Sequence, residues 1–340
     1  MKDLILPDEW NEKAKGILSS GKITVVLGDV DTGKTTFVTY LANLSVREGH
    51  LTGIVDSDVG QSDIGPPTTI GLGIIDHPIS SLTQITPKAL YFVGSISPEK
   101  HLLPMVVGTQ KMVEKALFFG VERVIVDTTG LVYGGVGRAL KYHKIKGISP
   151  DNIIAIQKKQ EIEHLLKPFE VLKDIVIHRL SSPLHAKRRN QDIRRDSREK
   201  RLALYFRDAI GLDIPFSSIR TYNTFFLSGK PLNQDEIDRL SKELSEIVFY
   251  GERIPEGLYL VSADIIPERR LFHIKQKVFQ KTPEDFEGIL VGLGDEKGEV
   301  VSLGIIERID FSGMMLTIKT PFSTRGLIKT VQFSEFKLGT

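Results

Sequence analysis

The stretch that decides the fold lies near the start of the chain and reads Gly28-Asp29-Val30-Asp31-Thr32-Gly33-Lys34-Thr35. It fits the pattern G-x-x-x-x-G-K-[ST] of a phosphate-binding loop, or P-loop. The apolar residues 23–27 before it predict a buried strand, and residues 36–48 after it predict a helix that ends at Gly49. In this context, backbone N–H groups at the helix N-terminus cradle phosphate oxygens. The stretch therefore predicts nucleotide binding.

Within this loop the residue types predict separate tasks. We expect the nucleotide to contact the loop from Gly28 through Thr36. Lys34 is expected to reach the β- and γ-phosphates, and the Thr35 hydroxyl to ligate Mg²⁺. A glycine-rich turn formed by chance is the alternative, and the flanking strand and helix argue against it.

Composition limits the classes of protein to consider. A chain of 340 residues favours two domains. The absence of cysteine excludes disulfides, iron–sulfur clusters and cysteine-based zinc sites. The net charge of +2 favours no particular partner, so any nucleic-acid signal must be local. The first residues do not resemble a signal peptide, and no apolar run approaches membrane-spanning length, so we expect a cytoplasmic protein without a membrane partner.

Short apolar runs alternate with helical stretches over residues 20–180, which predicts an α/β fold of the P-loop NTPase type with a parallel sheet covered on both sides. The expected strands after the first are residues 52–56, 123–127, 152–156 and 174–177, with a helix over 104–119. From Gly257 the pattern becomes all-β and predicts a small barrel or sandwich. We expect a short N-terminal extension (1–20), a P-loop domain (21–248) with a lid near 183–206, and a β-rich C-terminal domain (249–340).

Two acidic motifs follow expected strands. Asp56 and Asp58 come at the end of the second strand, and Asp127 ends the third. Because ligands of such sheets bind at the carboxyl ends of the strands, we expect all three near the P-loop. Asp58 is predicted to be the general base that accepts the proton of an attacking hydroxyl, and Asp56 to support it or hold metal. A solvated turn is the alternative for this motif.

The third strand runs into Asp127-Thr128-Thr129-Gly130. An aspartate in this place commonly holds Mg²⁺ through water, and the glycine lets the backbone approach the γ-phosphate. A helix N-cap formed by one of the threonines is the alternative. The whole constellation favours the functional interpretation.

Residues 185–201 are strongly basic, with eight cations against three anions. Arg194, Arg198 and Arg201 share one face of a predicted helix. Such a run can be a solvated surface. Arginine also suits forked phosphate contacts, and a mobile arginine helix over a P-loop is typical of a kinase lid.

At this point the chain resembles a known family, the polynucleotide 5′-hydroxyl kinases that include the kinase subunit of the mRNA 3′-cleavage machinery, its nucleolar ribosomal-RNA-processing relatives and archaeal homologues. The P-loop is followed by 56–61, similar to the family's D-x-D-x-G-Q, then by 94–98, similar to G-x-x-[ST]-P. Residues 128–131 resemble the clasp T-x-G-W. The lid spacing is matched by Arg189, Arg194, Arg195, Arg198, Arg201, Tyr205 and Phe206.

The resemblance implies transfer of the γ-phosphate of ATP or GTP to the 5′-hydroxyl of RNA, with DNA as a further acceptor. It implies that Lys34 stabilises phosphate, that Thr35 holds Mg²⁺ and that Asp58 is the base. Lid arginines would be Arg189, Arg194 and Arg198. The candidates for gripping the substrate are Gln61, Pro67, Thr69, Thr129, Gly130 and Leu131.

The sequence departs from the family pattern at the clasp, where Leu131 replaces tryptophan. Stacking of a base on an aromatic ring, worth ~1–3 kcal/mol, is therefore absent at that position. Thr68 stands where glycine is frequent in the family, and His101 where asparagine is frequent.

Two other functions remain open at this point. A nucleotide-hydrolysing switch shares the two acidic strand ends, but residues 157–160 read Gln-Lys-Lys-Gln in place of a guanine motif, and the lid has no task there. A non-catalytic, nucleotide-bound scaffold in RNA processing is the third interpretation, which retention of Lys34, Thr35 and Asp58 disfavours.

Overall fold

The computed structural model describes residues 7–183 and 191–338. The chain divides into two compact units, residues 1–203 and 204–340. The P-loop domain was expected to extend to residue 248. Residues 204–248 belong to the second unit because their strands pair with strands from the C-terminal part of the chain.

The first unit contains one sheet in the order β7-β6-β1-β5-β2-β3-β4. Its strands are β1 (Ile23–Gly28), β2 (Thr52–Ser57), β3 (Thr69–Ile75), β4 (Ala89–Phe92), β5 (Arg123–Thr128), β6 (Asn152–Gln157) and β7 (Val176–Ser181). The pairs formed by β1, β2, β5, β6 and β7 are parallel, whereas β3 pairs antiparallel with β2 and with β4. The parallel arrangement expected for the predicted strands is confirmed. Strands β3 and β4, which were not predicted, make the sheet mixed, because a direct loop joins β2 to β3 without a crossover helix.

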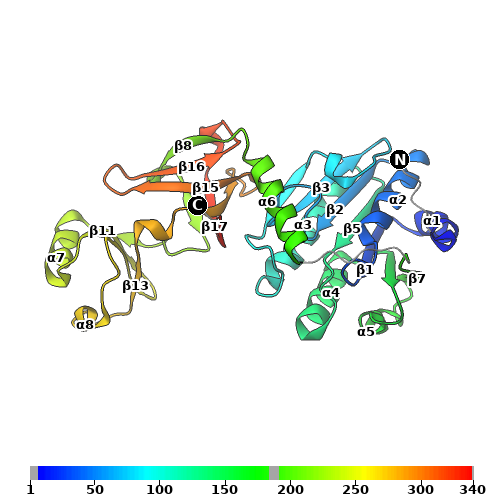
Figure 1. Cartoon of the computed structure of the whole chain (residues 1–340), viewed down its shortest axis with the longest axis horizontal. Coiled ribbons are helices and arrows are strands. Elements are labelled where there is room, and N and C mark those ends of the chain that lie inside the picture. The colour runs from blue at the N-terminus through cyan, green and yellow to red at the C-terminus, as the bar shows by residue number, and fades with distance from the viewer. Residues whose placement is uncertain (1–6, 184–190, 339–340) are drawn as a thin grey trace. The chain divides into compact units, whose positions relative to one another are not determined.

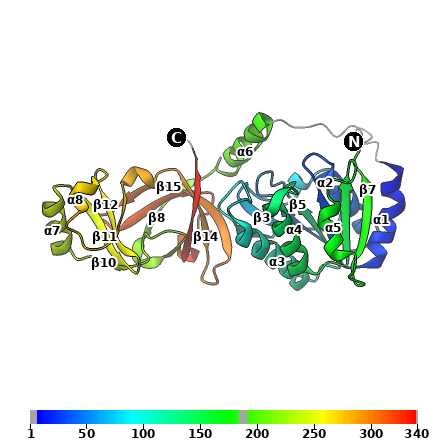
Figure 2. The same ribbon diagram turned by 90° about the horizontal axis from the view of Figure 1, so that it is seen from below.

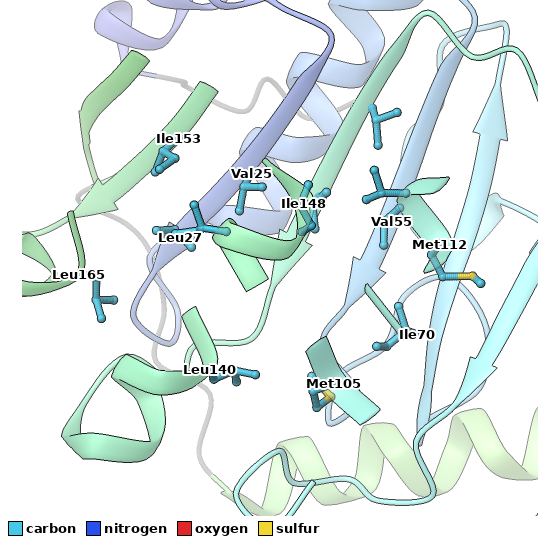
Figure 3. Close-up of a cluster of buried hydrophobic side chains, with 14 of the residues drawn as sticks. Val25, Leu27, Val55, Ile70, Met105, Met112, Leu140, Ile148, Ile153 and Leu165 are labelled. Carbon is cyan, nitrogen blue, oxygen red and sulfur yellow. The ribbon is translucent and has the colours of Figure 1, made fainter. Parts of the chain in front are cut away.

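Helices cover both faces of this sheet (Figures 1 and 2). They are α1 (Asp8–Ser20), α2 (Lys34–Arg47), α3 (Leu102–Phe118), α4 (Gly134–Ile148) and α5 (Glu163–Leu166), and the arginine-rich helix α6 (Gln191–Tyr205) follows them in the chain. Helices α1 and α2 share one buried cluster with Val26 and Ile54. Helices α3, α4 and α5 share the cluster on the opposite face, which contains Val25, Leu27 and Val55 (Figure 3). Successive strand residues alternate between these clusters, as a two-sided sheet requires.

Helix α1 is part of the core of the first unit. The Trp10 ring is fully buried and meets the Phe37 ring of α2 edge to face, with centroids 4.9 Å apart. Its indole Nε1 donates to the Ser181 carbonyl at the end of β7, at 3.1 Å. Residues 8–20 therefore pack on the sheet and do not extend away from it.

Strand register brings the predicted motifs to one edge. Strand β5 lies between β1 and β2, and Asp127 is aligned with Val26 on one side and with Asp56 on the other. The P-loop leaves β1 just beyond this level, at Gly28. Three loops therefore begin side by side at the carboxyl ends of adjacent parallel strands, where α/β proteins bind ligands.

The second unit is rich in β-structure. One group of paired strands runs in the order β8-β16-β15-β14-β17-β9, and a four-stranded sheet has the order β10-β11-β12-β13. The bounds are β8 (Ile210–Pro215), β9 (Arg220–Tyr222), β10 (Lys230–Pro231), β11 (Val248–Ile254), β12 (Gly257–Ser262), β13 (Val278–Lys281), β14 (Ile289–Gly294), β15 (Val300–Asp310), β16 (Met315–Thr320), β17 (Thr330–Lys337), α7 (Gln234–Leu244) and α8 (Glu268–Leu271). Both groups of strands contribute to one aromatic core around Phe226.

Candidate kinase active site

The P-loop is shaped by two glycines. A Cβ atom on Gly28 would lie 2.5 Å from the Thr32 hydroxyl oxygen and 2.6 Å from the Ile156 carbonyl, so the position has no room for a side chain. Gly33 has a φ of 92°, in the left-handed region, and directly precedes α2. The Thr32 hydroxyl donates to the Asp29 carbonyl at 2.9 Å. The loop thus ends at a helix N-terminus whose first N–H groups have no partner within the helix, which is a ready anion site.

Lys34 lies buried at this helix start. Its Nζ donates to the Asp29 carbonyl at 2.8 Å. Burial lowers the pKa of Lys34, while the negative charges of Asp127 and Asp58 act to raise it. The ammonium therefore lies in the field of both acidic strand ends and near the loop that would hold phosphate.

Asp127 and Thr35 form the candidate magnesium site. The Thr35 hydroxyl donates to Asp127 Oδ2 at 2.7 Å. Asp127 Oδ1 is buried and has no hydrogen-bond partner among the residues that the structure describes. Burial raises the pKa of Asp127 to about 6, with Lys34 and Thr35 acting in the opposite direction. An orphaned carboxylate oxygen beside a hydroxyl is the hard oxygen donor set that suits Mg²⁺.

No group of three or more acidic or histidine side chains in the described ranges is placed to hold a metal ion. In nucleotide-binding enzymes Mg²⁺ is usually bound by only one or two protein oxygens, because phosphate oxygens and water molecules provide the other ligands.

The Asp56 side chain points toward the loop that follows β2. Its carboxylate accepts hydrogen bonds from the backbone N–H groups of Asp58 at 3.1 Å and Ile64 at 3.0 Å, and from that of Asp63. Burial, together with the nearby carboxylates of Asp63 and Asp127, raises the pKa of Asp56 well above its ordinary value. These contacts show that Asp56 holds the loop that carries Asp58, which fits the supporting role expected from the sequence, and its metal role stays a prediction.

Asp58 is less buried than Asp56, and its carboxylate stabilises the turn that follows it. Its Oδ1 accepts from the N–H groups of Gly60 and Gln61, both at 3.2 Å. The buried Nε2 of the Gln61 side chain has no partner among the described residues. Asp58 and Gln61 therefore lie on a loop whose backbone is fixed by two carboxylates while the Gln61 amide stays available for a ligand.

The following segment, 65–69, contains a strained residue. Thr68 has a φ of 77°, which is rare for a β-branched side chain, and its buried hydroxyl has no partner in the described part of the chain. The Thr69 hydroxyl donates to the Pro66 carbonyl at 2.7 Å, so it is already engaged. Strain of this kind persists only where the surroundings enforce it, and it gathers at functional sites.

The clasp segment after β5 packs closely on the P-loop. A Cβ atom on Gly130 would lie 2.6 Å from Val30 Cγ2 and 2.7 Å from the Val30 nitrogen, so only glycine fits there. The Leu131 N–H points to the Thr129 hydroxyl at 3.4 Å, and the Leu131 side chain packs against the hydrophobic core. The Tyr133 hydroxyl donates to Asp29 Oδ2 at 3.1 Å.

Two lid arginines contact the site loops within the first unit. Arg194 Nη2 is 2.8 Å from Asp31 Oδ2 of the P-loop. Arg201 bonds to the Ser62 carbonyl and to the Asp63 carboxylate, in the loop that Asp56 organises. Arg198 lies half-buried on the same helix. The remaining predicted lid residue, Arg189, lies outside the described residues.

Residues 28–208, more than half of the chain, match the family model of the P-loop of the mRNA cleavage and polyadenylation factor CLP1. The chain belongs to the CLP1 P-loop family. A polyribonucleotide 5′-hydroxyl kinase of Pyrococcus furiosus is 33% identical over 335 residues, which are 98% of this chain and 93% of that protein. One from Methanocaldococcus jannaschii is 34% identical over 316 residues, 92% of this chain and 86% of that protein.

A solved structure supports the fold of this CLP1 P-loop family member. A chain in the structure of the wild-type Clp1p–Pcf11p complex superposes with a TM-score of 0.65 at 11% identity, and the match covers 97% of this chain and 79% of that one. Within the described ranges, no helix is at once long and apolar enough to cross a membrane.

Two buried lysines near the site of this CLP1 P-loop family member were not predicted from the sequence. Lys141 and Lys144 lie on α4 with exposed fractions of 1% each. Lys141 Nζ donates to the Thr128 hydroxyl at 2.9 Å and to the Thr129 carbonyl, and Lys144 Nζ donates to the Ser57 hydroxyl at 2.7 Å. Two lysines three residues apart are typical of a solvated helix face. The only sequence signal for a role at the site is that their helix begins directly after the clasp.

Proposed function

We propose that this chain is a polyribonucleotide 5′-hydroxyl kinase that transfers the γ-phosphate of ATP or GTP to the 5′-hydroxyl end of RNA. The observation that carries the proposal is its likeness to kinases of this activity over nearly the full chain, in the presence of an intact P-loop, Asp58 and the arginine helix. DNA is a second acceptor to be tested.

The reaction assigns a role to each group at the sheet edge. The 5′-oxygen of the acceptor attacks the γ-phosphorus, the bond from that phosphorus to the β–γ bridging oxygen breaks, and the nucleoside diphosphate leaves. Asp58 accepts the proton that the 5′-hydroxyl loses. Lys34 and the lid arginines Arg194 and Arg198 stabilise the charge on the phosphoryl oxygens, together with Arg189.

Thr35 and Asp127 would hold Mg²⁺ through their oxygens, among them the unpartnered Asp127 Oδ1. The ion would neutralise phosphate charge and orient the γ-phosphate. Asp56 acts indirectly, because its carboxylate accepts a hydrogen bond from the backbone N–H of Asp58 and so fixes the position of that residue.

The acceptor end is gripped by the two loops beside Asp58. The unpartnered Gln61 amide supports a polar contact to the acceptor. Pro67 and Thr69 border the strained turn, and Thr129, Gly130 and Leu131 form the clasp. Because Leu131 replaces an aromatic residue, we infer apolar contact without stacking at this position.

The test is incubation of purified protein with γ-labelled ATP, Mg²⁺ and a 5′-hydroxyl oligoribonucleotide, with the 5′-phosphorylated oligonucleotide as control. The proposal predicts label on the 5′-hydroxyl strand alone. Label released wholly as inorganic phosphate would contradict it and favour a nucleotide-hydrolysing switch. Parallel reactions with GTP and with DNA rank donors and acceptors.

A further inference from the structure

Burial of the two lysines of α4 costs free energy, and packing of the core alone does not explain why lysine stands at these positions. Lys141 and Lys144 are among the largest fully buried side chains described, although lysine normally extends its ammonium to water. Removing an ammonium from water costs several kcal/mol even after the protein relaxes. Burial lowers the pKa of Lys144 to about 7 and that of Lys141 well below its ordinary value. A packed helix would be more stable with apolar side chains at both positions.

Their contacts connect the ends of three neighbouring strands. Lys144 Nζ donates to the Ser57 hydroxyl at the end of β2, and this hydroxyl donates to the Asp127 carbonyl of β5 at 2.9 Å. Lys141 Nζ donates to Thr128, whose hydroxyl reaches the Val26 carbonyl of β1 at 2.7 Å. Each lysine therefore ties side chains beneath the site to the backbone of an adjacent strand.

The surrounding charges are mostly negative. Asp56, Asp58 and Asp127 all attract the Lys144 ammonium. Lys141 experiences repulsion from Lys144 and Lys34, and attraction from Asp58 and Asp127. Both amines therefore lie in the field of carboxylates at the strand ends, at a range where water does not screen the interaction.

The path of α4 explains how both lysines reach this place. The helix begins at Gly134, directly after the clasp, and a Cβ atom on Gly137 would lie 2.8 Å from the Val132 carbonyl carbon. Close packing at Gly137 seats the helix against the clasp. Residues three apart then share one face, which places both ammonium groups below the strand ends.

We propose that Lys141 and Lys144 are positioning residues of the kinase site: they hold the ends of β2 and β5 so that Asp58 and the clasp face the reacting groups. The inference rests on the proposed function. Lys144 is the cleaner probe, because Ser57 keeps its bond to the Asp127 carbonyl when the ammonium is removed.

The experiment compares Lys144→Met, which keeps most of the apolar stem, with Lys146→Met, which changes an exposed lysine on the same helix. We expect kcat for transfer to a 5′-hydroxyl oligoribonucleotide to fall about 10–100-fold in Lys144→Met, as for other residues that orient catalytic groups. The KM for ATP should stay within about twofold, because the interaction acts on the chemical step. The melting temperature should be equal or higher, and Lys146→Met should resemble the wild type.

A second variant separates the loss of the amine from the loss of volume. Lys144→Ala leaves a cavity of alkylamine size, and we expect n-propylamine to restore kcat in a saturable manner, whereas n-propanol should not. Wild-type kcat in Lys144→Met, or equal restoration by the alcohol, would overturn the inference while the wild type still transfers phosphate. A wild type that transfers none would overturn the proposed function itself.

Discussion

Gly130→Ala tests how the clasp and the P-loop depend on each other. The added Cβ would lie 2.6 Å from Val30 Cγ2, 2.7 Å from its nitrogen and 2.8 Å from its Cα, where ordinary contacts begin at 3.4 Å. Two of these atoms belong to the backbone of the P-loop, so no rotamer relieves the overlap, and the loop must retreat by more than half an ångström. Overpacking of this kind costs ~1–3 kcal/mol.

Because each 1.4 kcal/mol corresponds to a factor of ten, displacement of the P-loop from its phosphate-binding geometry should raise the Kd for ATP by about tenfold to a hundredfold. The assay is titration with ATP in Mg²⁺, with the melting temperature measured alongside. Gly135→Ala is the matched control, since a Cβ at this position of α4 meets nothing within 4 Å. ATP binding by Gly130→Ala as tight as that of the wild type would refute the reasoning.

Three further outcomes are expected. Arg194→Ala should lower kcat about a hundredfold or more with little change in ATP affinity. Arg195→Ala, which removes an exposed ion pair, should leave kcat unchanged. Equal kcat values for the two variants would mean that the arginine helix is only a solvated surface helix. Thr68→Gly should raise the free energy of unfolding, because relief of ~1–3 kcal/mol of strain exceeds the entropy that glycine loses, whereas Thr69→Gly should lower it; denaturant unfolding measures both. In Lys144→Met, stability relative to the wild type should fall as the pH rises from about 7 toward 10.5, because the wild-type unfolded state binds the extra proton in this window; melting curves with no pH-dependent difference would contradict this.

The sequence predicted the centre of the first unit because its signals are local. The P-loop, the strands ending at Asp56 and Asp127, and a helix carrying Arg194 follow from short patterns of apolar and charged residues, and parallel strands bring such ends to one edge.

The remainder depends on contacts between distant residues. Strand β3 was not predicted, and its antiparallel pairing with β2 depends on how the loop after β2 turns back on the sheet. The separate tasks of Asp56 and Asp58 follow from which backbone N–H groups the loop turns toward each carboxylate. Lys144 was missed because charge normally indicates a solvated face, and here the helix face is buried.

The most direct test of the central claim is single-turnover transfer from γ-labelled ATP to a 5′-hydroxyl oligoribonucleotide by Asp58→Asn, with ATP affinity measured on the same preparation. Asparagine keeps the oxygen that accepts from Gly60 and Gln61, so the loop should hold its shape. The account predicts ATP affinity near that of the wild type and transfer slowed by about 10²–10⁴-fold, the range for loss of a general base. Transfer at the wild-type rate would contradict it.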